Sequence, residues 1–196
     1  MARSSAVGPP HWPEGVQYSQ RYIFHSSVTA TTKNFIEKGP KSTKNRGSSR
    51  MTVIRRVSEP SHPAFGQFGL FAAKKISAKE HILDYIGDSE PIAGMNSTDF
   101  VPGEVHTDER IESNYDLSLH RFESGESVGI DAGRMGNEGR FINDFRGVRA
   151  KPNSVFTDYR DSGGQLRMGV YAGGEDIRKG DEILVSYGKG FWKATG

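Results

Sequence analysis

Two polar residues directly follow an apolar pair in the segment RFINDFRG at residues 140–147. Asn143 and Asp144 come after Phe141 and Ile142, and amide or carboxylate side chains are unfavourable next to an apolar core unless their hydrogen bonds are satisfied. The two residues therefore either cap a turn after a strand or bind the polar end of a ligand. The residue types alone leave both interpretations open.

Two other segments carry residues that could serve a bound ligand. Gly66 and Gly69 in GQFG let a backbone approach a ligand closely, although the same residues also suit a plain turn. Tyr187 ends the apolar run EILVSY and is either a core residue at a strand end or a hydroxyl that faces a reactant. A phenol with a pKa of about 10 is a poor base near neutral pH, so orienting a reactant is its more plausible chemistry.

Short strands must position these residues, because apolar and polar residues alternate in brief runs from residue 51 onward. A hairpin is predicted over residues 115–132, with ESGE at its turn. No long helical periodicity is present, and SAKEHI and IRKGDEI each place a polar turn before a strand. The predicted fold class is therefore mostly β, of the α+β type. The runs are TVIRRV, LFAAKKI, HILDYIGD, YDLSL, VGIDA, RMGVYA and EILVSY.

The composition divides the chain into a basic extension rich in Ser, Thr and Lys at residues 1–50 and one domain at 51–196. Residues 38–50 contain five basic and no acidic residues, which favours a solvated linker; a nuclear-import patch or a nucleic-acid or histone-tail contact are the alternatives. RYIFHSSVTA, at 21–30, could instead form a strand that packs on the domain. A polar stretch broken by Pro and Gly predicts an insert at about 88–114.

Several classes of protein are excluded by composition. The chain has no Cys, which excludes a disulfide framework and thiolate zinc sites, and its six His lack the spacing of metal ligands, so no metal is expected. No apolar run is long enough for a membrane span, and no signal peptide is present, which predicts an intracellular protein. With a net charge of +2, direct nucleic-acid binding is not expected.

Four segments, in the right order, resemble the SET domain of protein-lysine methyltransferases. GQFGLFAAKKI is similar to the Gly-rich opening segment of that family, and ILDYIGD to its E-Y-x-G-E strand. The central segment RFIND followed by PN is similar to RFINHSC-x-PN, and KGDEILVSYGKGFW to the closing GEEL-x-x-DYG. The resemblance implies short sheets around a knot-like crossing, where the segment after RFIND meets the closing segment. The overall form is similar to fungal SET proteins without zinc-binding Cys clusters.

The chain also departs from the family pattern. Asp144 stands where the family has His, Phe145 and Arg146 replace Ser-Cys, and Gln67 takes the position of the first Gly of G-x-G. A residue whose backbone contacts the ligand tolerates a changed side chain, so Asp144 weakens the resemblance only modestly. The zinc-binding Cys segments that flank many SET domains are missing.

The resemblance implies S-adenosylmethionine as the cofactor, with S-adenosylhomocysteine as its product, and a role for each matching residue. Tyr187 is the expected catalytic residue, which orients the target amine and the methyl group. Val185 lies where many relatives have Phe or Tyr, a position that influences how many methyl groups fit. The expected lysine channel consists of Tyr85, Tyr115 and Val185. The expected cofactor-binding residues are Gly66, Gln67, Phe68, Arg140, Phe141, Asn143, Asp144, Tyr187 and Trp192.

The expected function is methyl transfer to lysine side chains of a protein or peptide, with a histone as a candidate substrate and the nucleus favoured over the cytoplasm. One alternative is a degenerate SET module that binds a histone tail or partner peptide without turnover. Asp144, Arg146 and Gln67 are the grounds for it. Another is a nucleic-acid binder that uses the basic extension, which the small net charge disfavours.

Overall fold

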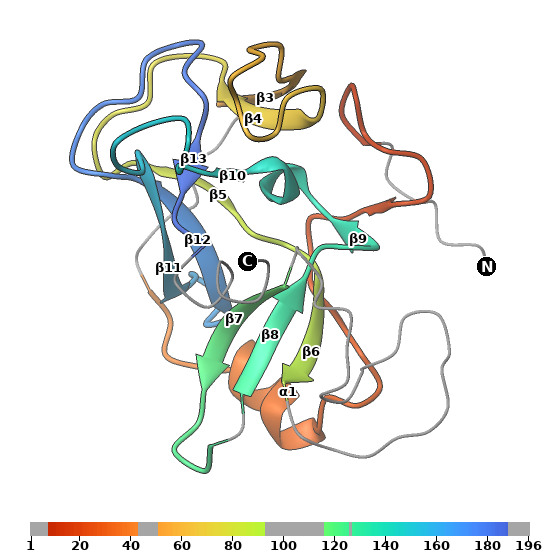
Figure 1. Ribbon diagram of the computed structural model, residues 1–196. Coiled ribbons are helices and arrows are strands. Elements are labelled where there is room, and N and C mark those ends of the chain that lie inside the picture. Colours follow the sequence, from red (N-terminus) through yellow and green to blue (C-terminus); the bar gives the residue numbers. More distant parts are fainter. Residues whose placement is uncertain (1–7, 43–50, 93–115, 126, 188–196) are drawn as a thin grey trace. The chain divides into compact units, whose positions relative to one another are not determined.

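The computed structural model describes residues 8–42, 51–92, 116–125 and 127–187. Within these residues the chain is mostly β, with a single α-helix (Figure 1), which confirms the predicted fold class. The chain forms two compact units, called unit 1 and unit 2 below. Unit 1 comprises Met1–Asn45, Tyr85–Arg140 and Asp158–Met168, and unit 2 comprises Arg46–Asp84, Phe141–Thr157 and Gly169–Gly196.

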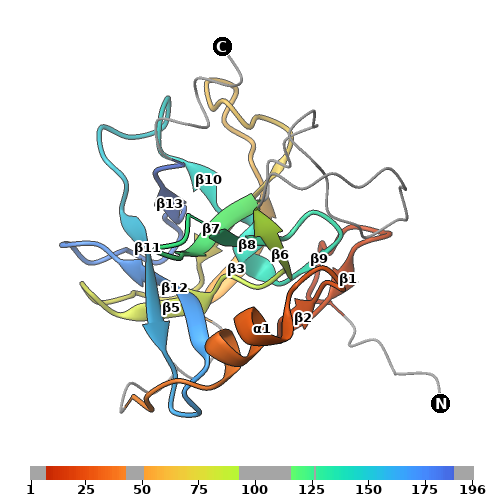
Figure 2. The same ribbon diagram turned by 90° about the horizontal axis from the view of Figure 1, so that it is seen from below.

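Unit 1 contains a four-stranded sheet in the order β2-β6-β8-β7. The antiparallel pair β7–β8 confirms the predicted hairpin, and β6 lies on the other side of β8 (Figures 1 and 2). Val128 and Ile130 of β8 are fully buried, as expected for alternate residues on the core face of a strand. The strands are β2 (Ile23–Phe24), β6 (Asp88–Ile92), β7 (Asp116–Arg121) and β8 (Ser127–Asp131).

The predicted insert begins with a β-strand. Its first five residues form β6, which pairs with β2 and β8, so the insert starts inside the sheet of unit 1 rather than in a loop. The remainder of the insert, from residue 93, lies outside the described residues.

Much of the N-terminal extension packs within unit 1. Strand β1 (Gln17–Tyr18) pairs in parallel with β9 (Met135–Gly136), and β2 pairs in parallel with β6. The predicted strand in RYIFHSSVTA is thus present as β2. Gly39 and Ser42 donate backbone hydrogen bonds to the carbonyls of Gly164 and Asp161. The described part of the predicted linker is therefore attached to unit 1, and residues 43–50 lie outside the described residues.

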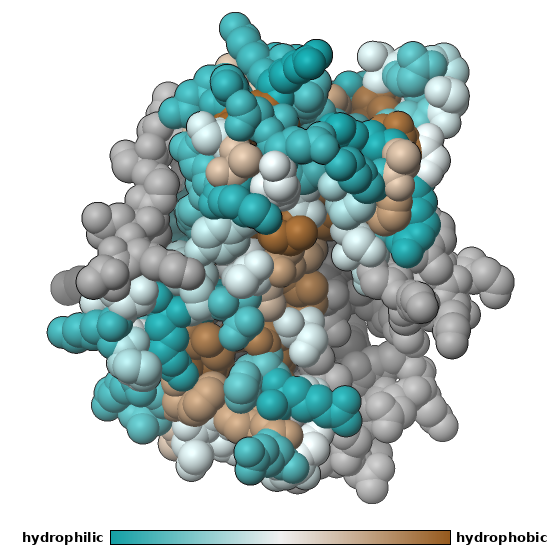
Figure 3. Space-filling model, turned by 90° about the vertical axis from the view of Figure 1, so that its left-hand side faces the viewer, coloured by the Kyte–Doolittle hydropathy of each residue, from teal (hydrophilic) through white to brown (hydrophobic). Residues whose placement is uncertain are grey.

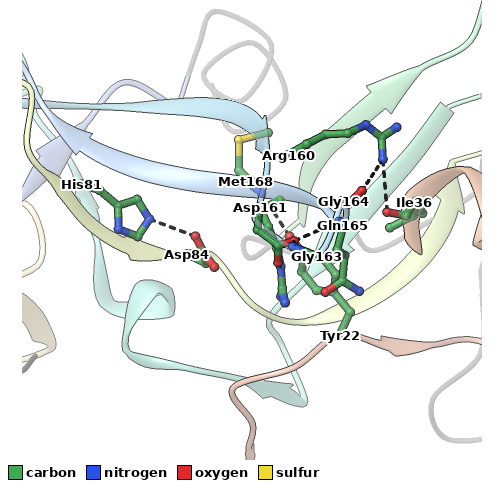
Figure 4. Close-up of polar contacts among 11 residues, drawn as sticks. Tyr22, Ile36, His81, Asp84, Arg160, Asp161, Gly163, Gly164, Gln165 and Met168 are labelled. Atoms are coloured by element: carbon green, nitrogen blue, oxygen red, sulfur yellow. Dashed lines mark hydrogen bonds and ion pairs between the residues drawn. The ribbon is translucent and has the colours of Figure 1, made fainter. Parts of the chain in front are cut away.

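Helix α1 (Ala30–Glu37) was not indicated by the sequence pattern, because eight residues give too little periodicity. At its start the hydroxyl of Thr29 accepts a hydrogen bond from the Thr32 N–H at 3.1 Å. At its end Nη1 of Arg160 donates to the Phe35 carbonyl at 3.0 Å. It also donates to the carbonyls of Ile36, at 3.4 Å, and Gly164, at 2.9 Å (Figure 4). The guanidinium thereby satisfies carbonyls that a helix end leaves without partners.

Two isoleucines of the extension test whether it packs as described. The Ile36 side chain is fully buried, whereas Ile23 is 42% exposed. We expect Ile36→Ala to lower the free energy of unfolding by at least about 2 kcal/mol, because a buried side chain leaves a cavity. The same change at Ile23 is expected to cost much less. Urea unfolding of both variants measures the difference, and equal small losses would show that the extension is an unpacked linker.

Unit 2 combines three small sheets. Strands β3 and β4 pair antiparallel, β5 joins β11 and β12 in the order β11-β12-β5, and β10 pairs in parallel with β13. Residues 158–160 of β11 and 166–168 of β12 belong to unit 1. The strands are β3 (Thr52–Arg56), β4 (Phe68–Ala72), β5 (His81–Asp84), β10 (Asn143–Asp144), β11 (Ser154–Arg160), β12 (Leu166–Ala172) and β13 (Leu184–Val185).

The core of unit 2 follows from the register of its strands. Ile54 of β3 lies opposite Leu70 of β4, and both side chains are at most 2% exposed. Ile76 and Ile177 form an antiparallel bridge, and both are buried. Polar turns follow each of them, and Lys79 and Gly180 in these turns have positive φ. The two turns predicted from SAKEHI and IRKGDEI are confirmed.

The surface drawn in Figure 3 is mainly hydrophilic, with apolar residues in smaller areas between. The large apolar side chains exposed among the described residues are Ile23, Phe65 and Val155, and single exposed residues of this kind are normal. Among the described residues, no helix has the length and hydropathy needed to cross a membrane.

Candidate functional site

The segment RFIND and the closing segment meet in unit 2. In the parallel pair of β10 and β13, Asn143 lies opposite Leu184 and Asp144 opposite Val185. The amide of Asn153, from the PN pair, donates to the Glu182 carbonyl at 2.7 Å and accepts from the Leu184 N–H at 2.8 Å. RFIND and PN therefore both hydrogen-bond to the closing segment, as the resemblance implied.

Asn143 is hydrogen-bonded to a buried carboxylate. Its Nδ2 donates to Oε1 of Glu182 at 2.8 Å, and Nε2 of His62 lies 2.9 Å from Oε2 of the same carboxylate. The side chains of His62 and Glu182 are only 6% and 8% exposed. Asn143 itself is half-buried, and none of the described residues donates to its Oδ1. The amide nitrogen thus bonds within the protein, while the amide oxygen keeps its capacity to accept a hydrogen bond from a ligand.

The glycine at position 69 makes room for this contact. A Cβ on Gly69 would lie 2.5 Å from Oε1 of Glu182 and 3.2 Å from Nδ2 of Asn143. Any larger residue would push the carboxylate and the amide away from the backbone of β4. Gly66 has a different requirement, because its φ of +80° lies in the region that favours glycine. One cluster in unit 2 is thus formed by His62, Gly69, Asn143 and Glu182.

Asp144 connects the segment RFIND to the backbone of the closing segment. Its Oδ2 accepts hydrogen bonds from the Tyr187 N–H at 2.8 Å and from Nη1 of Arg146 at 2.9 Å. Its Oδ1 accepts from the Arg146 N–H at 2.8 Å. The two departures from the family pattern at 144 and 146 therefore form one ion pair, in which a buried carboxylate is neutralised by its neighbour.

Tyr187 lies against the strand that carries Asn143. Its hydroxyl donates to the carbonyl of Ile142 at 2.6 Å. The hydroxyl proton is committed to that carbonyl, so the oxygen can act towards a reactant only as a hydrogen-bond acceptor. Val185, two residues earlier, is fully buried in the core of unit 2.

Among the expected cofactor-binding residues, Phe68 and Phe141 lie near each other. Their ring centroids are 6.3 Å apart in an edge-to-face arrangement, with Phe141 buried and Phe68 half-buried. Gln67, between Gly66 and Phe68, is exposed. Gly66, Gln67, Phe68, Phe141, Asn143, Asp144, Val185 and Tyr187 all belong to unit 2.

Arg140 and Tyr85 belong to unit 1. The guanidinium of Arg140 donates to the carbonyls of Ala132 and Gly133 at 3.0 and 3.2 Å, and lies 5.8 Å from the ring centroid of Trp12. Arg140 thus supports the backbone that precedes η1 (Glu138–Phe141). Tyr85 is buried and donates its N–H to the Met168 carbonyl at 2.7 Å. Tyr115 and Trp192 lie outside the described residues.

Sequence reasoning did not single out His62 or Glu182. Both are polar residues in ordinary loop and strand contexts, and their contact spans 120 residues of sequence. The one sequence signal was Glu182 itself, an acidic residue directly before the apolar run ILV. Among the described residues, no group of three His, Cys, Asp or Glu could hold a metal ion.

Comparisons with known proteins agree with the motifs. The family model described as SET domain matches residues 67–188, more than half of the chain. A protein named histone-lysine N-methyltransferase, H3 lysine-4 specific, from Eremothecium gossypii is 27% identical over 141 residues, which cover 71% of this chain and 13% of the relative. Its counterpart from Kluyveromyces lactis is 26% identical over 71% of this chain and 12% of the relative. The chain thus spans about an eighth of the length of these two relatives.

A solved structure shares the fold. The crystal structure of ATXR5 in complex with mono-methylated histone H3.1 has a TM-score of 0.60 and 18% sequence identity, with 88% of this chain and 81% of that chain covered. At that identity the likeness shows the fold alone.

Proposed function

Because this chain belongs to the SET domain family, we propose that it transfers a methyl group from S-adenosylmethionine to a lysine side chain of a protein. The observation that carries the proposal is the pairing of β10 with β13. That pairing brings Asn143, the candidate cofactor ligand, and Tyr187, the candidate catalytic residue, together in unit 2.

The residues of unit 2 fit the chemistry of the cofactor. Oδ1 of Asn143 would accept a hydrogen bond from the ammonium of the methionine end, because the amide nitrogen is already bonded to Glu182. Phe68 and Phe141 would provide apolar surface next to the adenosine. Asp144 would hold the backbone of Tyr187 in register with RFIND, which explains how a carboxylate can stand where the family has His.

Methyl transfer requires positioning more than acid or base strength. When bound, S-adenosylmethionine supplies a methyl group activated by a positively charged sulfur. The lysine amine, with an ordinary pKa of about 10.4, must give its proton to solvent water before it can attack. As the new N–C bond forms, the S–C bond would break, its electron pair would stay on sulfur, and S-adenosylhomocysteine would be the leaving group. The hydroxyl proton of Tyr187 is bonded to the Ile142 carbonyl, so the hydroxyl oxygen would accept a hydrogen bond from the lysine amine. That bond would hold the lone pair of the amine nitrogen towards the methyl carbon. No metal ion is needed for this displacement.

The proposed substrate class is a histone tail. The two matched relatives are named as H3 lysine-4 specific methyltransferases, and ATXR5 was crystallised with a histone. A protein that modifies histones works on chromatin, so we propose a nuclear location.

The second candidate function is binding of a histone tail or partner peptide without turnover. The changed residues Gln67, Asp144 and Arg146 favour it. The bonds of Asp144 to Tyr187 and Arg146 argue against it, because they give Asp144 and Arg146 a role in holding the closing segment. Binding of S-adenosylmethionine distinguishes the two functions.

We expect Asn143→Ala to weaken S-adenosylmethionine binding by roughly 5- to 150-fold, which corresponds to about 1–3 kcal/mol for a polar ligand group that loses its partner. Isothermal titration calorimetry measures the dissociation constant. The matched control is Asn34→Ala, on the exposed face of α1, which should leave the affinity unchanged. If wild type and Asn143→Ala bound S-adenosylmethionine with equal affinity, Asn143 would not be a cofactor ligand and would serve only in the turn.

Turnover itself is tested with the wild-type chain and labelled S-adenosylmethionine. Incubation with recombinant histones and with a nuclear lysate, followed by mass spectrometry, should reveal methyl-lysine on a histone tail. A chain that binds the cofactor and methylates another protein would correct the substrate class. A chain that binds a peptide but neither binds the cofactor nor transfers a methyl group would establish the second candidate function.

A further inference from the structure

We propose that Glu182 and His62 are positioning residues that fix the amide of Asn143 in the one orientation that suits the cofactor. The inference rests on the proposed function and deepens it. It starts from an ambiguity of asparagine: the oxygen and nitrogen of the amide exchange places when the group flips by half a turn. A ligand ammonium can bind the oxygen but is repelled by the amide N–H groups, so a cofactor site needs one orientation.

The carboxylate of Glu182 imposes that orientation. An ionised carboxylate only accepts hydrogen bonds, so the atom of Asn143 that lies 2.8 Å from Oε1 must be the nitrogen. A flipped amide would face its oxygen towards a carboxylate oxygen, and two acceptors at that distance repel each other. The low exposure of Glu182, at 8%, strengthens the preference because little water screens it.

His62 holds the carboxylate in turn. Nδ1 of His62 accepts a hydrogen bond from the Ala64 N–H at 2.9 Å, so the ring proton of the neutral form must be on Nε2, which faces Oε2 of Glu182 at 2.9 Å. Both ring nitrogens therefore have defined roles, and the ring can only donate to Glu182. Among the described residues, each oxygen of the carboxylate has one donor, His62 on Oε2 and Asn143 on Oε1.

Gly69 shows that the arrangement is built into the backbone. The absence of a side chain at this position leaves the space in which Oε1 of Glu182 and Nδ2 of Asn143 meet. The Gly-rich segment was expected to admit the cofactor, and Gly69 has a second reason to be glycine. It allows β4 to pass directly beside the contact that orients Asn143.

The central experiment is a double-mutant cycle on cofactor affinity. Glu182→Gln preserves the shape of the side chain, but the new amide can satisfy the flipped Asn143. S-adenosylhomocysteine is the probe, since it keeps the methionine end and cannot turn over. We expect Glu182→Gln to weaken the binding of S-adenosylhomocysteine about tenfold in the wild-type background. In the Asn143→Ala background the same change should alter the affinity less than about twofold, because the residue through which Glu182 acts is gone.

Two controls separate positioning from a general loss of structure. Glu175→Gln makes the same change at an exposed glutamate of unit 2 and should leave the affinity unchanged. His62→Gln keeps an N–H donor near the position of Nε2, whereas His62→Leu removes it, so the first should retain more affinity than the second. If thermal unfolding shows that Glu182→Gln is not folded at the temperature of the binding measurement, the comparison of His62→Gln with His62→Leu tests the inference instead.

A readout without ligand distinguishes failure of the inference from failure of the proposed function. The side-chain amide protons of Asn143, followed by ¹⁵N nuclear magnetic resonance in the free protein, should shift and exchange faster with water in Glu182→Gln. Unchanged Asn143 signals, or equal losses of affinity in both backgrounds of the cycle, would overturn the positioning role. Wild-type protein that does not bind S-adenosylhomocysteine, with the expected Asn143 signals, would instead overturn the proposed function.

Discussion

Tyr187→Phe is expected to lower the rate of methyl transfer by about 10²–10³ while cofactor affinity stays within a few-fold of wild type. The variant removes one hydroxyl that is fixed by the Ile142 carbonyl at 2.6 Å, and loss of one preorganised polar group at a reacting centre has effects of this size. The decrease should appear in kcat rather than only in KM, since the contact is made chiefly in the transition state. Single-turnover methyl transfer to the identified protein substrate measures it.

The same hydroxyl also contributes to the fold, so stability must be measured alongside the rate. Its removal leaves the Ile142 carbonyl without that donor, and we expect a loss of about 0.5–1.5 kcal/mol in unfolding free energy. Tyr171→Phe, a hydroxyl deletion on β12 of unit 2, is the control and should keep wild-type turnover. A Tyr187→Phe variant that binds cofactor and reacts at the wild-type rate would remove Tyr187 from the mechanism.

The second large effect is on stability and is expected for Asp161→Ala in unit 1. Oδ2 of Asp161 accepts from Nε of Arg167 at 3.1 Å. Oδ1 accepts from the N–H groups of Gly163 and Gln165, which lie beside Asp161 in Figure 4. The two ionic side chains are only 12% and 7% exposed. Without the carboxylate, the Arg167 charge stays buried and loses this counter-ion, and we expect a loss of about 3–5 kcal/mol in unfolding free energy.

Urea unfolding measures this loss, and Asp176→Ala is the matched control. Asp176 also forms an ion pair, with Lys75 at 2.7 Å, but both side chains are largely exposed, so its loss should be clearly smaller. If the two variants were destabilised equally, the buried pair would contribute no more than a surface pair, and the description of Asp161 and Arg167 as a buried ion pair would be wrong.

The pH dependence of stability provides an independent check on Asp161. Burial raises the pKa of its carboxyl, but the hydrogen bonds from Gln165, Arg167 and Gly163 outweigh burial and hold the pKa below its usual value. A depressed pKa in the folded state adds stability above the unfolded pKa of about 3.9, and that stability is lost as the pH falls through the folded value. The difference in stability between wild type and Asp161→Ala should therefore narrow below about pH 4. A difference that is constant from pH 6 to pH 3 would contradict this.

The elements predicted from the sequence are those whose signal is local. Alternation of apolar and polar residues predicted the hairpin β7–β8, and Val128 and Ile130 are buried on the core face of β8. Helix α1 was not predicted, because its stability depends on contacts outside the helix. Arg160, for example, donates hydrogen bonds to its last carbonyls from 124 and 125 residues away in sequence. The resemblance of RFIND and EILVSYG likewise pointed to the pairing of β10 with β13.

By itself the sequence determined the family, the mostly β fold and the two residues on which the proposed chemistry depends, Asn143 and Tyr187. Those features rest on residue types in short segments, which the chain carries in any conformation. Only the tertiary structure decided what those residues contact. Glu182 reaches Asn143 across 39 positions, and His62 reaches Glu182 across 120, in a space that Gly69 leaves open. A buried carboxylate accepts hydrogen bonds from whichever donors the fold brings within reach. The orientation of Asn143 therefore depends on the packing of unit 2 and cannot be predicted from the segment RFIND alone.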